Sequence, residues 1–338
     1  MPKITLNPRG TRFEADSKVS ILDAAAAAGI TLPYSCRIGR CSTCKCKLID
    51  GQTTVLYAES GLDAKEQEQG WILGCARVAN TDLVLEVECL VGTSLPPART
   101  LPCRITSIER PAPDLVSIRL RLPPASDFKF IPGQHIDVIG RDGLRRSYSL
   151  ASAGPAEEGL ELHIRAMEGG VMSGYWFNLA KVDDLLRLHG PRGTFFLRDV
   201  AGVDLIFLAT GTGIAPVKAM IESLSLPTSD GGPRSVTVLW GARTARDLFL
   251  DIGRMPAVHQ FIPVLSRAGD DWNGARGHVQ DVLLARNPDL EDAVVYASGS
   301  AAMIRDARAA LLRAGLPDTR FHSDAFVDSG APGGIVQL

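Results

Sequence analysis

Four cysteines near the N-terminus have a spacing suited to metal chemistry. Cys36, Cys41 and Cys44 follow the pattern C-x4-C-x2-C, and Cys75 lies about thirty residues further on. This spacing is typical of a 2Fe–2S cluster, because a loop can wrap three thiolates around two irons while a distant cysteine supplies the fourth ligand. A structural zinc ion is the alternative, but zinc ligands usually come as two close pairs, whereas Cys75 stands alone. We therefore predict that these four cysteines hold a 2Fe–2S cluster.

The other three cysteines, Cys46, Cys89 and Cys103, fall outside this pattern. They lie in or at the start of strand-like runs, where a free cysteine is usually a small buried apolar residue. An odd count of seven cysteines does not suit a disulfide framework. The N-terminus also lacks the apolar core of a signal peptide, so we expect a cytoplasmic protein.

The composition is that of an ordinary globular protein. The chain is 45% hydrophobic and 22% charged, which excludes a disordered or collagen-like protein. Its formal net charge is −2 and it has no long run of one sign, so we do not expect it to bind nucleic acid. The most apolar stretch, residues 205–217, is shorter than the roughly 20 residues that span a bilayer, so we expect no membrane association.

The length of 338 residues predicts two or three domains. We assign residues 1–92 to a small cysteine-rich domain and residues 93–100, which include Pro96 and Pro97, to a linker. Short β-runs separated by turns predict an antiparallel barrel over residues 101–200. Strands that alternate with helices predict an α/β domain with a parallel sheet over residues 201–338.

Several segments resemble a known family. YSCRIGRCSTCKCKLIDG and WILGCARV are similar to plant-type ferredoxins, which implies a β-grasp fold for the first domain. RSYS at residues 146–149 and GTGIAP at residues 211–216 resemble the flavin and nucleotide motifs of the ferredoxin-NADP reductase superfamily. The order ferredoxin, flavin barrel, nucleotide domain is that of single-chain reductases. LPCRI, GPRGTFFLRD and FHSDAFV are most similar to CDP-6-deoxy-hexulose-3-dehydrase reductases, with naphthalene-dioxygenase-type reductases a near second.

The resemblance implies a flavin site in the barrel. Arg146 would donate to a pyrophosphate, Tyr148 would place its ring against the flavin, and Ser149 would bring a hydroxyl near flavin N5. The segment Gly169–Ser173 resembles a second phosphate site at a helix start, which favours FAD over FMN. The further candidates for cofactor contacts are Ser147, His163, Arg165, Gly170, Val171, Met172, Ser173 and Phe326. A solvated sheet face is the alternative for His163 and Arg165, and a core aromatic is the alternative for Phe326.

The resemblance also implies a nucleotide site in the last domain. Gly211, Thr212, Gly213 and Pro216 join a strand to a helix whose N-terminus would face a phosphate. The segment from Tyr296 resembles the family pattern Y-x-C-G-x-x-x-M, in which Gly299 and Met303 match and Ser298 replaces the usual cysteine. We expect this hydroxyl to slow hydride transfer or to leave more of the positioning to Ser149.

The loop after SVTVLW bears on the choice of coenzyme. Arg243 or Arg246 would meet a 2′-phosphate, whereas Asp247 would accept from a ribose hydroxyl. The alternative is that these arginines form a solvated helix start. We favour NADH over NADPH.

Electron counting orders the expected cofactors. NADH or NADPH delivers two electrons as hydride and a 2Fe–2S cluster accepts one, so a flavin must stand between them. The resemblance therefore implies an NAD(P)H-dependent oxidoreductase, with Ser149 and Ser298 as catalytic candidates. It would pass electrons to a separate protein, such as a dideoxysugar dehydrase or an oxygenase component. The alternatives are a reductase of a small soluble acceptor and a non-enzymatic redox carrier or sensor. We expect a monomer.

Overall fold

The computed structural model describes residues 1–90, 92–140, 143–225 and 231–327. The chain divides into two compact units. The first contains Met1–Leu95, Gly193–Phe195 and the chain from Asp324 onward, and the second contains Pro96–Arg192 and Phe196–Ser323. The predicted barrel and the predicted α/β domain therefore belong to one unit.

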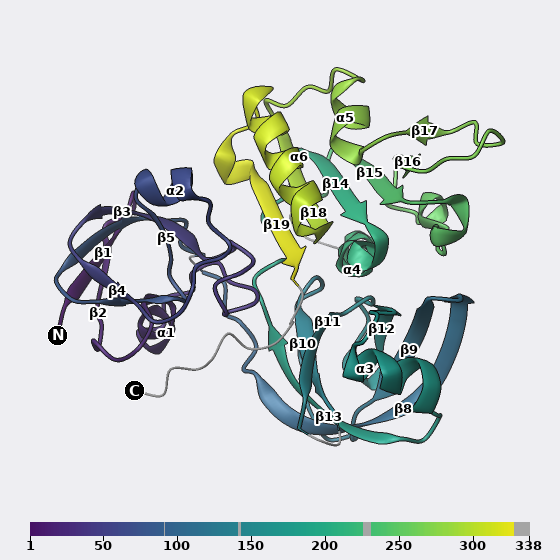
Figure 1. The fold of residues 1–338 in the computed structure, drawn as a ribbon, viewed down its shortest axis with the longest axis horizontal. Helices are drawn as coiled ribbons and strands as arrows, with labels where there is room; N and C mark the ends of the chain where they lie inside the picture. The colour runs from purple at the N-terminus through teal and green to yellow at the C-terminus, as the bar shows by residue number, and fades with distance from the viewer. Residues whose placement is uncertain (91, 141–142, 226–230, 328–338) are drawn as a thin grey trace. The chain divides into compact units, whose positions relative to one another are not determined.

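A five-stranded sheet forms the core of the first unit (Figure 1). Its order is β2 (Thr11–Glu14), β1 (Lys3–Asn7), β7 (Leu83–Glu86), β3 (Lys45–Asp50) and β5 (Trp71–Leu73). β1 and β7 are parallel, and the other neighbours are antiparallel. Helix α1 (Ile21–Ala27) begins at the Ser20 cap and packs Ile21, Leu22 and Ala25 into the core. The predicted β-grasp fold is confirmed.

Three smaller elements complete the first unit. Strands β4 (Thr53–Val55) and β6 (Arg77–Ala79) pair as a two-stranded sheet. The short helix α2 (Ala64–Glu68) begins at Asp63, whose side chain accepts from the Glu66 N–H while the Glu66 side chain accepts from the Asp63 N–H.

The second unit begins with an antiparallel barrel. Its strands are β8 (Arg99–Ala112), β9 (Leu115–Arg121), β10 (His135–Ile139), β11 (Arg145–Ser149), β12 (Leu160–Arg165) and β13 (Leu185–Arg192), in the order β11-β10-β13-β8-β9-β12. A bridge between Leu150 and Leu162 joins the two ends and closes the barrel. A short helical segment, η1 (Ala156–Glu158), precedes β12, and α3 (Val171–Gly174) continues into η2 (Tyr175–Leu179) with Trp176 fully buried.

A second six-stranded sheet follows in the same unit. Its order is β17 (Ala275–Arg276), β16 (Gln260–Leu265), β15 (Ser235–Ala242), β14 (Asp204–Thr210), β18 (Ala293–Ser300) and β19 (Phe321–Phe326). The strands from β17 to β18 pair in parallel, and the interiors of β14 and β18 are buried almost throughout, as expected for a covered parallel sheet. Its helical segments are η3 (Gly211–Gly213), α4 (Ile214–Leu224), η4 (Ala245–Asp247), η5 (Ile252–Arg254), α5 (Val279–Leu284), α6 (Ala301–Arg313) and η6 (Asp318–Arg320).

The strand order reverses direction between β14 and β18. From β14 the chain moves outward through β15 and β16, and it then returns to place β18 on the other side of β14. In open α/β sheets the crevice at such a switch point, outside the carboxyl ends of the strands, is the usual place for a ligand. Among the described residues, no helix is long and apolar enough to cross a bilayer.

Candidate functional site

The loop that carries three of the four cysteines has an unusual backbone. Arg37 and Ser42 have φ values of 58° and 63°, and Gly39 has a φ of 74°. Residues other than glycine seldom adopt this left-handed region, and such strain is concentrated at functional sites. The turns point N–H groups at sulfur, since the Cys36 N–H donates to Cys41 Sγ at 3.4 Å and the Ile38 N–H donates to Cys36 Sγ at 3.5 Å. The loop is therefore built to donate hydrogen bonds to thiolates.

The four thiols meet as two pairs. A hydrogen bond with Cys41 lowers the pKa of the Cys36 thiol to about 6, and the same bond raises the pKa of Cys41 well above its ordinary value. Likewise, a hydrogen bond with Cys44 lowers the pKa of Cys75, while that bond and burial raise the pKa of Cys44. Two thiols per metal is the arrangement that a dinuclear cluster requires.

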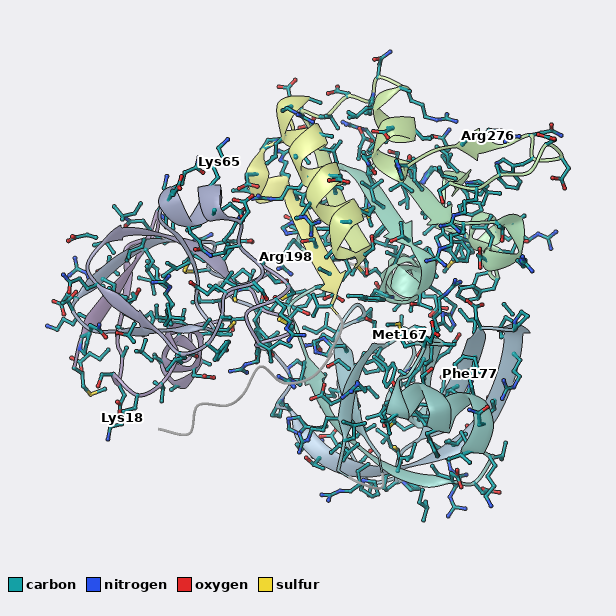
Figure 2. All side chains as sticks on the ribbon, in the orientation of Figure 1. Lys18, Lys65, Met167, Phe177, Arg198 and Arg276 are labelled. Carbon is teal, nitrogen blue, oxygen red and sulfur yellow. The ribbon has the colours of Figure 1, made fainter. Side chains whose placement is uncertain are left out.

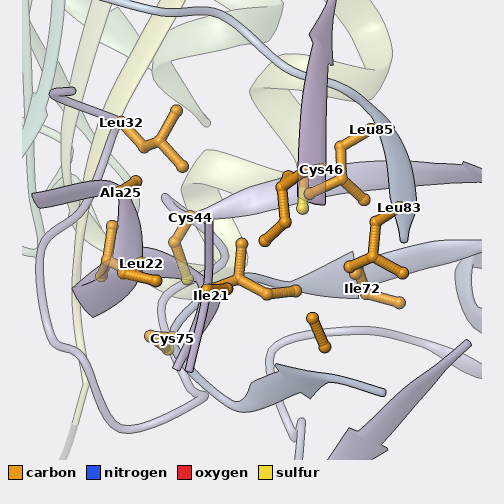
Figure 3. Close-up of a cluster of buried hydrophobic side chains, with 14 of the residues drawn as sticks. Ile21, Leu22, Ala25, Leu32, Cys44, Cys46, Ile72, Cys75, Leu83 and Leu85 are labelled. Atoms are coloured by element: carbon orange, nitrogen blue, oxygen red, sulfur yellow. The ribbon is translucent and has the colours of Figure 1, made fainter. Parts of the chain in front are cut away.

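The surroundings of the thiols also suit a cluster. Cys44 and Cys75 lie among the aliphatic side chains that pack around Ile21 and Leu22 (Figure 3). The Thr43 hydroxyl is buried beside the Cys41 thiol, whose pKa it lowers, and has no other partner in the described part of the chain. Across the same described residues, no three His, Cys, Asp or Glu side chains gather closely enough to hold a single ion.

The remaining cysteines are buried, as the sequence predicts. Cys46, Cys89 and Cys103 are each at most 8% exposed. Burial raises the pKa of Cys46 and of Cys103 to about 12, and it also raises the pKa of Cys89. Their thiols therefore stay protonated at neutral pH.

Strand β11 carries the RSYS motif on two opposite faces. Residues alternate along a strand, so Arg146 and Tyr148 share one face and Ser147 and Ser149 share the other. The Tyr148 hydroxyl accepts a hydrogen bond from Trp176 Nε1 at 2.9 Å, and the two rings meet edge to face. Burial raises the pKa of Tyr148 to about 12, so it stays a neutral phenol. Arg146 and Tyr148 are therefore placed to contact one ligand together.

The serine face of β11 belongs partly to the barrel itself. The Ser147 hydroxyl donates to Asp137 Oδ1 at 2.6 Å, and Asp137 also forms an ion pair with Arg192. Ser149 is buried at 9% exposure and lies opposite His135 on β10. Ser147 thus has a structural partner in Asp137. Ser149 is the last residue of β11, and its expected role near flavin N5 stays a prediction.

The glycine segment after β12 forms a tight turn into α3. Gly169 has a φ of 70°, and a Cβ on Gly170 would lie 3.1 Å from the Met167 carbonyl oxygen. The Met167 N–H donates to Ser173 Oγ at 2.8 Å, which fixes the turn. The side chains of Met167 and Val171 are exposed, whereas Met172 is buried (Met167 is labelled in Figure 2). The Gly170 N–H donates to the Met167 carbonyl at 3.0 Å, whereas the described contacts leave the hydroxyl proton of Ser173 for a phosphate.

His163 and Arg165 do not form a solvated sheet face. His163 is 6% exposed, its Nε2 lies 2.6 Å from Glu161 Oε1, and its ring packs edge to face on Phe249. Arg165 forms ion pairs with Asp114 and Asp247, and its Nε and Nη2 atoms are buried without a partner among the described residues. That alternative is wrong for His163, and Arg165 retains donors for a ligand.

Glu161 belongs to a half-buried charge network that the sequence does not reveal. Lys218 on α4 donates to Glu222 Oε1 at 2.7 Å, to the Ala151 carbonyl at 2.8 Å and to Glu161 Oε2 at 3.2 Å. The network therefore joins barrel strand β12 to the first helix of the parallel-sheet domain. From the sequence, the i, i+4 spacing of Lys218 and Glu222 could have suggested the ion pair between these two residues, but not the contact with Glu161.

At the switch point two glycines touch the opposite loop. A Cβ on Gly213 would lie 2.3 Å from the Ser298 carbonyl oxygen, and a Cβ on Gly299 would lie 2.3 Å from Thr210 Oγ1. Gly299 also has a φ of 126°, which side chains rarely tolerate. The turn Gly211–Gly213 also contacts strand β12 of the barrel. The sequence-predicted nucleotide residues are thus brought together beside the barrel.

Ser298 lies inside this contact. Its residue is fully buried, and its Oγ has no hydrogen-bond partner in the described part of the chain. A buried hydroxyl without a partner is costly, so such an atom is typical of a ligand site. Pro216 lies in the first turn of α4 and Met303 in that of α6, and both are buried.

The predicted coenzyme residues after β15 have separate environments. The Asp247 carboxylate accepts from the Thr244 N–H and hydroxyl, both at 2.9 Å, and pairs with Arg165. Both oxygens of the Asp247 carboxylate thus already have partners within the protein, Thr244 and Arg165. Arg246 lines a cavity of about 250 Å³ together with Arg267, Asp271 and Trp272. The sequence analysis did not single out these last three residues. Arg243 does not line this cavity.

Phe326 ends strand β19 and is 38% exposed. This exposure contradicts its alternative assignment as a core aromatic. Its contact with a flavin stays a prediction.

Comparisons with known proteins agree with this organisation. Residues 4–80 match the 2Fe-2S iron-sulfur cluster binding domain, residues 102–197 the oxidoreductase FAD-binding domain and residues 207–309 the oxidoreductase NAD-binding domain. The chain is 40% identical over 332 residues to a CDP-6-deoxy-L-threo-D-glycero-4-hexulose-3-dehydrase reductase of Yersinia pseudotuberculosis, covering 96% of this chain and 98% of that protein. The chain belongs to the single-chain iron–sulfur flavoprotein reductases.

Other relatives of this reductase family serve oxygenases. Terephthalate 1,2-dioxygenase reductase component 1 of Comamonas sp. is 32% identical, covering 92% of this chain and 93% of that protein. The crystal structure of the Amycolatopsis cytochrome P450 reductase GcoB superposes with a TM-score of 0.72 at 28% identity, covering 96% and 99% of the two chains. The protein is thus an NAD(P)H-dependent flavin oxidoreductase with 2Fe–2S, FAD and NAD-binding domains, as its sequence predicts.

Proposed function

We propose that this reductase takes hydride from NADH or NADPH and passes single electrons to a separate protein through a cluster held by Cys36, Cys41, Cys44 and Cys75. The pairing of these four thiols carries the proposal, because it provides two thiolates for each of two irons. When bound, FAD supplies the conversion from a two-electron donor to one-electron transfers. The chain's own residues must hold these groups and keep their reacting atoms in place.

Different residues of the barrel would contact different parts of FAD. Arg146 and Tyr148, on one face of β11, would bind the pyrophosphate and pack against the flavin. The Gly169–Ser173 turn would supply backbone N–H groups to a second phosphate oxygen, and the unpartnered Arg165 donors would add to this binding.

The switch-point residues would hold the nicotinamide. Gly213 and Gly299 leave room for a close backbone approach, and the unpartnered Ser298 hydroxyl would hydrogen bond to the nicotinamide. Ser149 would position the flavin from the opposite side. The sequence favours NADH, but the cavity lined by Arg246 and Arg267 suits a 2′-phosphate and Asp247 is already hydrogen bonded to Thr244. We therefore retain both coenzymes.

The acceptor would be a protein of the kind that the relatives serve, a sugar dehydrase or an oxygenase component. We further propose that the reductase acts as a monomer in the cytoplasm. The cysteines of the described residues are all free, which suits a reducing compartment.

Two artificial acceptors test the electron path. The purified protein is assayed for NADH and NADPH oxidation with ferricyanide, which takes electrons from flavin, and with cytochrome c, which takes single electrons from the cluster. Cys41→Ser should remove the cluster absorption and at least nine tenths of cytochrome c reduction while ferricyanide reduction continues. Cys89→Ser, which alters a buried cysteine outside the ligand set, should leave both activities in place. A Cys41→Ser protein that keeps its cluster would refute the ligand assignment.

A further inference from the structure

One face of barrel strand β12 contacts the segment that follows β15. His163 and Arg165 are two residues apart on the strand, so their side chains share this face. The His163 ring packs edge to face on Phe249 with 5.2 Å between the ring centroids, and Arg165 Nη1 donates to Asp247 Oδ1 at 3.3 Å. Residues 244–249, here called the coenzyme loop, are therefore held against the barrel at two points.

The coenzyme loop also lines part of the cavity of about 250 Å³. Thr244, Ala245 and Arg246 all contribute to its lining. Asp247 fixes the backbone of this stretch, because its Oδ2 atom accepts from the Thr244 N–H and from the Thr244 hydroxyl, both at 2.9 Å. This is the reciprocal cap at the start of η4. One carboxylate thus shapes the lining of the cavity and joins it to the barrel.

The two oxygens of the Asp247 carboxylate have separate partners, Thr244 for Oδ2 and Arg165 for Oδ1. Burial would raise the pKa of Asp247, but the hydrogen bonds from Thr244 and the charge of Arg165 lower it, so the group is ionised at neutral pH. An amide at this position would still accept from Thr244 but would turn its own N–H donors toward the guanidinium. Asp247→Asn therefore removes the ion pair and keeps the cap.

Arg165 is also held from within the barrel. Its Nη1 atom lies 3.2 Å from Oδ2 of Asp114, a half-exposed residue in the turn between β8 and β9. The Nε and Nη2 atoms, on the opposite edge of the guanidinium, are buried without a partner among the described residues. Asp114 continues to orient this edge when Asp247 is changed. Of the two carboxylates, Asp247 alone belongs to the coenzyme loop.

We propose that Asp247 is a positioning residue for the coenzyme, which holds the coenzyme loop against barrel strand β12 through Arg165 and makes no contact with the coenzyme's ribose. The proposal rests on the coenzyme site of the proposed function. A loop that is fixed before binding loses less conformational freedom when the coenzyme binds, so its affinity is higher.

The size of the effect follows from the burial of the pair. Arg165 is 24% exposed and Asp247 is 13% exposed, so their ion pair lies between a surface pair and a buried one. Its loss should weaken binding of the adenosine half of the coenzyme by about five- to tenfold. The KM should rise by the same factor while kcat stays within about twofold, because the loop holds the ground state and the transition state equally.

A direct contact between Asp247 and the ribose predicts a different pattern. A carboxylate that accepts from the 2′-hydroxyl favours NADH and repels a 2′-phosphate, so its loss would weaken NADH binding and strengthen NADPH binding. A residue that acts through the position of the loop affects both coenzymes alike. The ratio of the two affinities therefore distinguishes the two roles.

The test uses ADP-ribose and 2′-phospho-ADP-ribose, which carry the adenosine halves of NADH and NADPH and undergo no hydride transfer. Their dissociation constants are measured by titration calorimetry on the full-length protein with FAD in excess. Both constants should rise by one common factor of about five- to tenfold in Asp247→Asn. Both should stay within about twofold in the control Asp114→Asn, which removes a carboxylate from the same guanidinium but does not touch the coenzyme loop.

Arg165→Met removes the same ion pair from the barrel side. It should raise both dissociation constants by the factor seen in Asp247→Asn, and the double variant should show no further loss, since the pair is already broken. Steady-state oxidation of NADH and NADPH with ferricyanide then measures KM and kcat for the same proteins.

Unchanged affinities in Asp247→Asn would overturn the proposal. A loss for ADP-ribose alone would also overturn it, because that pattern indicates direct contact with the ribose. Equal losses in Asp114→Asn, or additive losses in the double variant, would show that the ion pair is not the cause. Should Asp247→Asn fail to fold, Arg165→Met decides, since it must weaken both probes by one factor. A wild-type protein that binds neither probe would instead refute the proposed coenzyme site.

Discussion

Replacing Lys218 by methionine removes the ammonium group of the half-buried network with Glu161 and Glu222 but keeps most of the side-chain volume. In the folded protein Lys218 has a side chain 15% exposed and contacts Glu222, Glu161 and the Ala151 carbonyl at 2.7, 3.2 and 2.8 Å. Glu161 is half-buried, with 12% of its side chain exposed. The substitution therefore leaves a half-buried carboxylate and a carbonyl without their donor.

The expected cost follows from these contacts. Removal of one partner from a buried ion pair costs about 3–5 kcal/mol. Here Glu161 keeps His163 at 2.6 Å and Arg119 at 3.5 Å, and Glu222 is 32% exposed, so part of the loss is compensated. We therefore expect Lys218→Met to lower the free energy of unfolding by about 2–3 kcal/mol.

Urea unfolding at pH 7, followed by the fluorescence of released FAD, measures this change. Lys129→Met serves as the control, because Lys129 is 77% exposed and its ion pair with Asp127 is exposed as well; its effect should stay within about 0.5 kcal/mol. The double variant Lys218→Met with Glu161→Gln should lose less than the sum of the single losses, since both partners are then neutral. A loss below about 0.5 kcal/mol for Lys218→Met, or strictly additive losses, would refute the role given to this network.

Three further predictions concern the second unit. Burial would raise the pKa of Glu161, but the hydrogen bond from His163 and the charge of Lys218 lower it from 4.5 to about 2. The stabilisation that Glu161 contributes should therefore be present above pH 4.5 and be lost as the pH falls through about 2, which is measured as the difference in unfolding free energy between the wild type and Glu161→Gln. Gly213→Ala should raise the KM for NADH at least tenfold, because the added Cβ would lie 2.3 Å from the Ser298 carbonyl oxygen. The control Gly232→Ala, whose Cβ would have no atom within 4 Å, should leave this KM unchanged. Equal KM values for the two variants would contradict the close contact at Gly213. Arg246→Glu should lower the kcat/KM ratio of NADPH to NADH at least tenfold, and an unchanged ratio would show that Arg246 does not face the 2′-phosphate.

The sequence by itself determined the features that depend on local backbone chemistry. The spacing of Cys36, Cys41 and Cys44 within one short loop indicates which metal group their thiols can hold. This spacing is a local property of the chain and does not depend on how the other domains fold. The turns at Gly213 and Gly299 follow similar logic, because each joins a strand to a helix within a few residues. Short β-runs predicted the antiparallel barrel and alternating strands and helices predicted the parallel sheet, and the structure confirms both. The β-grasp fold, also confirmed, was predicted from the resemblance to plant-type ferredoxins.

Tertiary structure alone decided what lies opposite each side chain. Strand alternation in LELHIR, residues 160–165, places Glu161 and His163 on one face, but it does not say whether that face meets water or the helix that carries Lys218. The same limit hid the engagement of Asp247 by Arg165. The physical reason is that hydrogen bonds and ion pairs form between groups brought together by packing, far apart in the chain. Periodicity reports only the neighbours that a residue has along its own element.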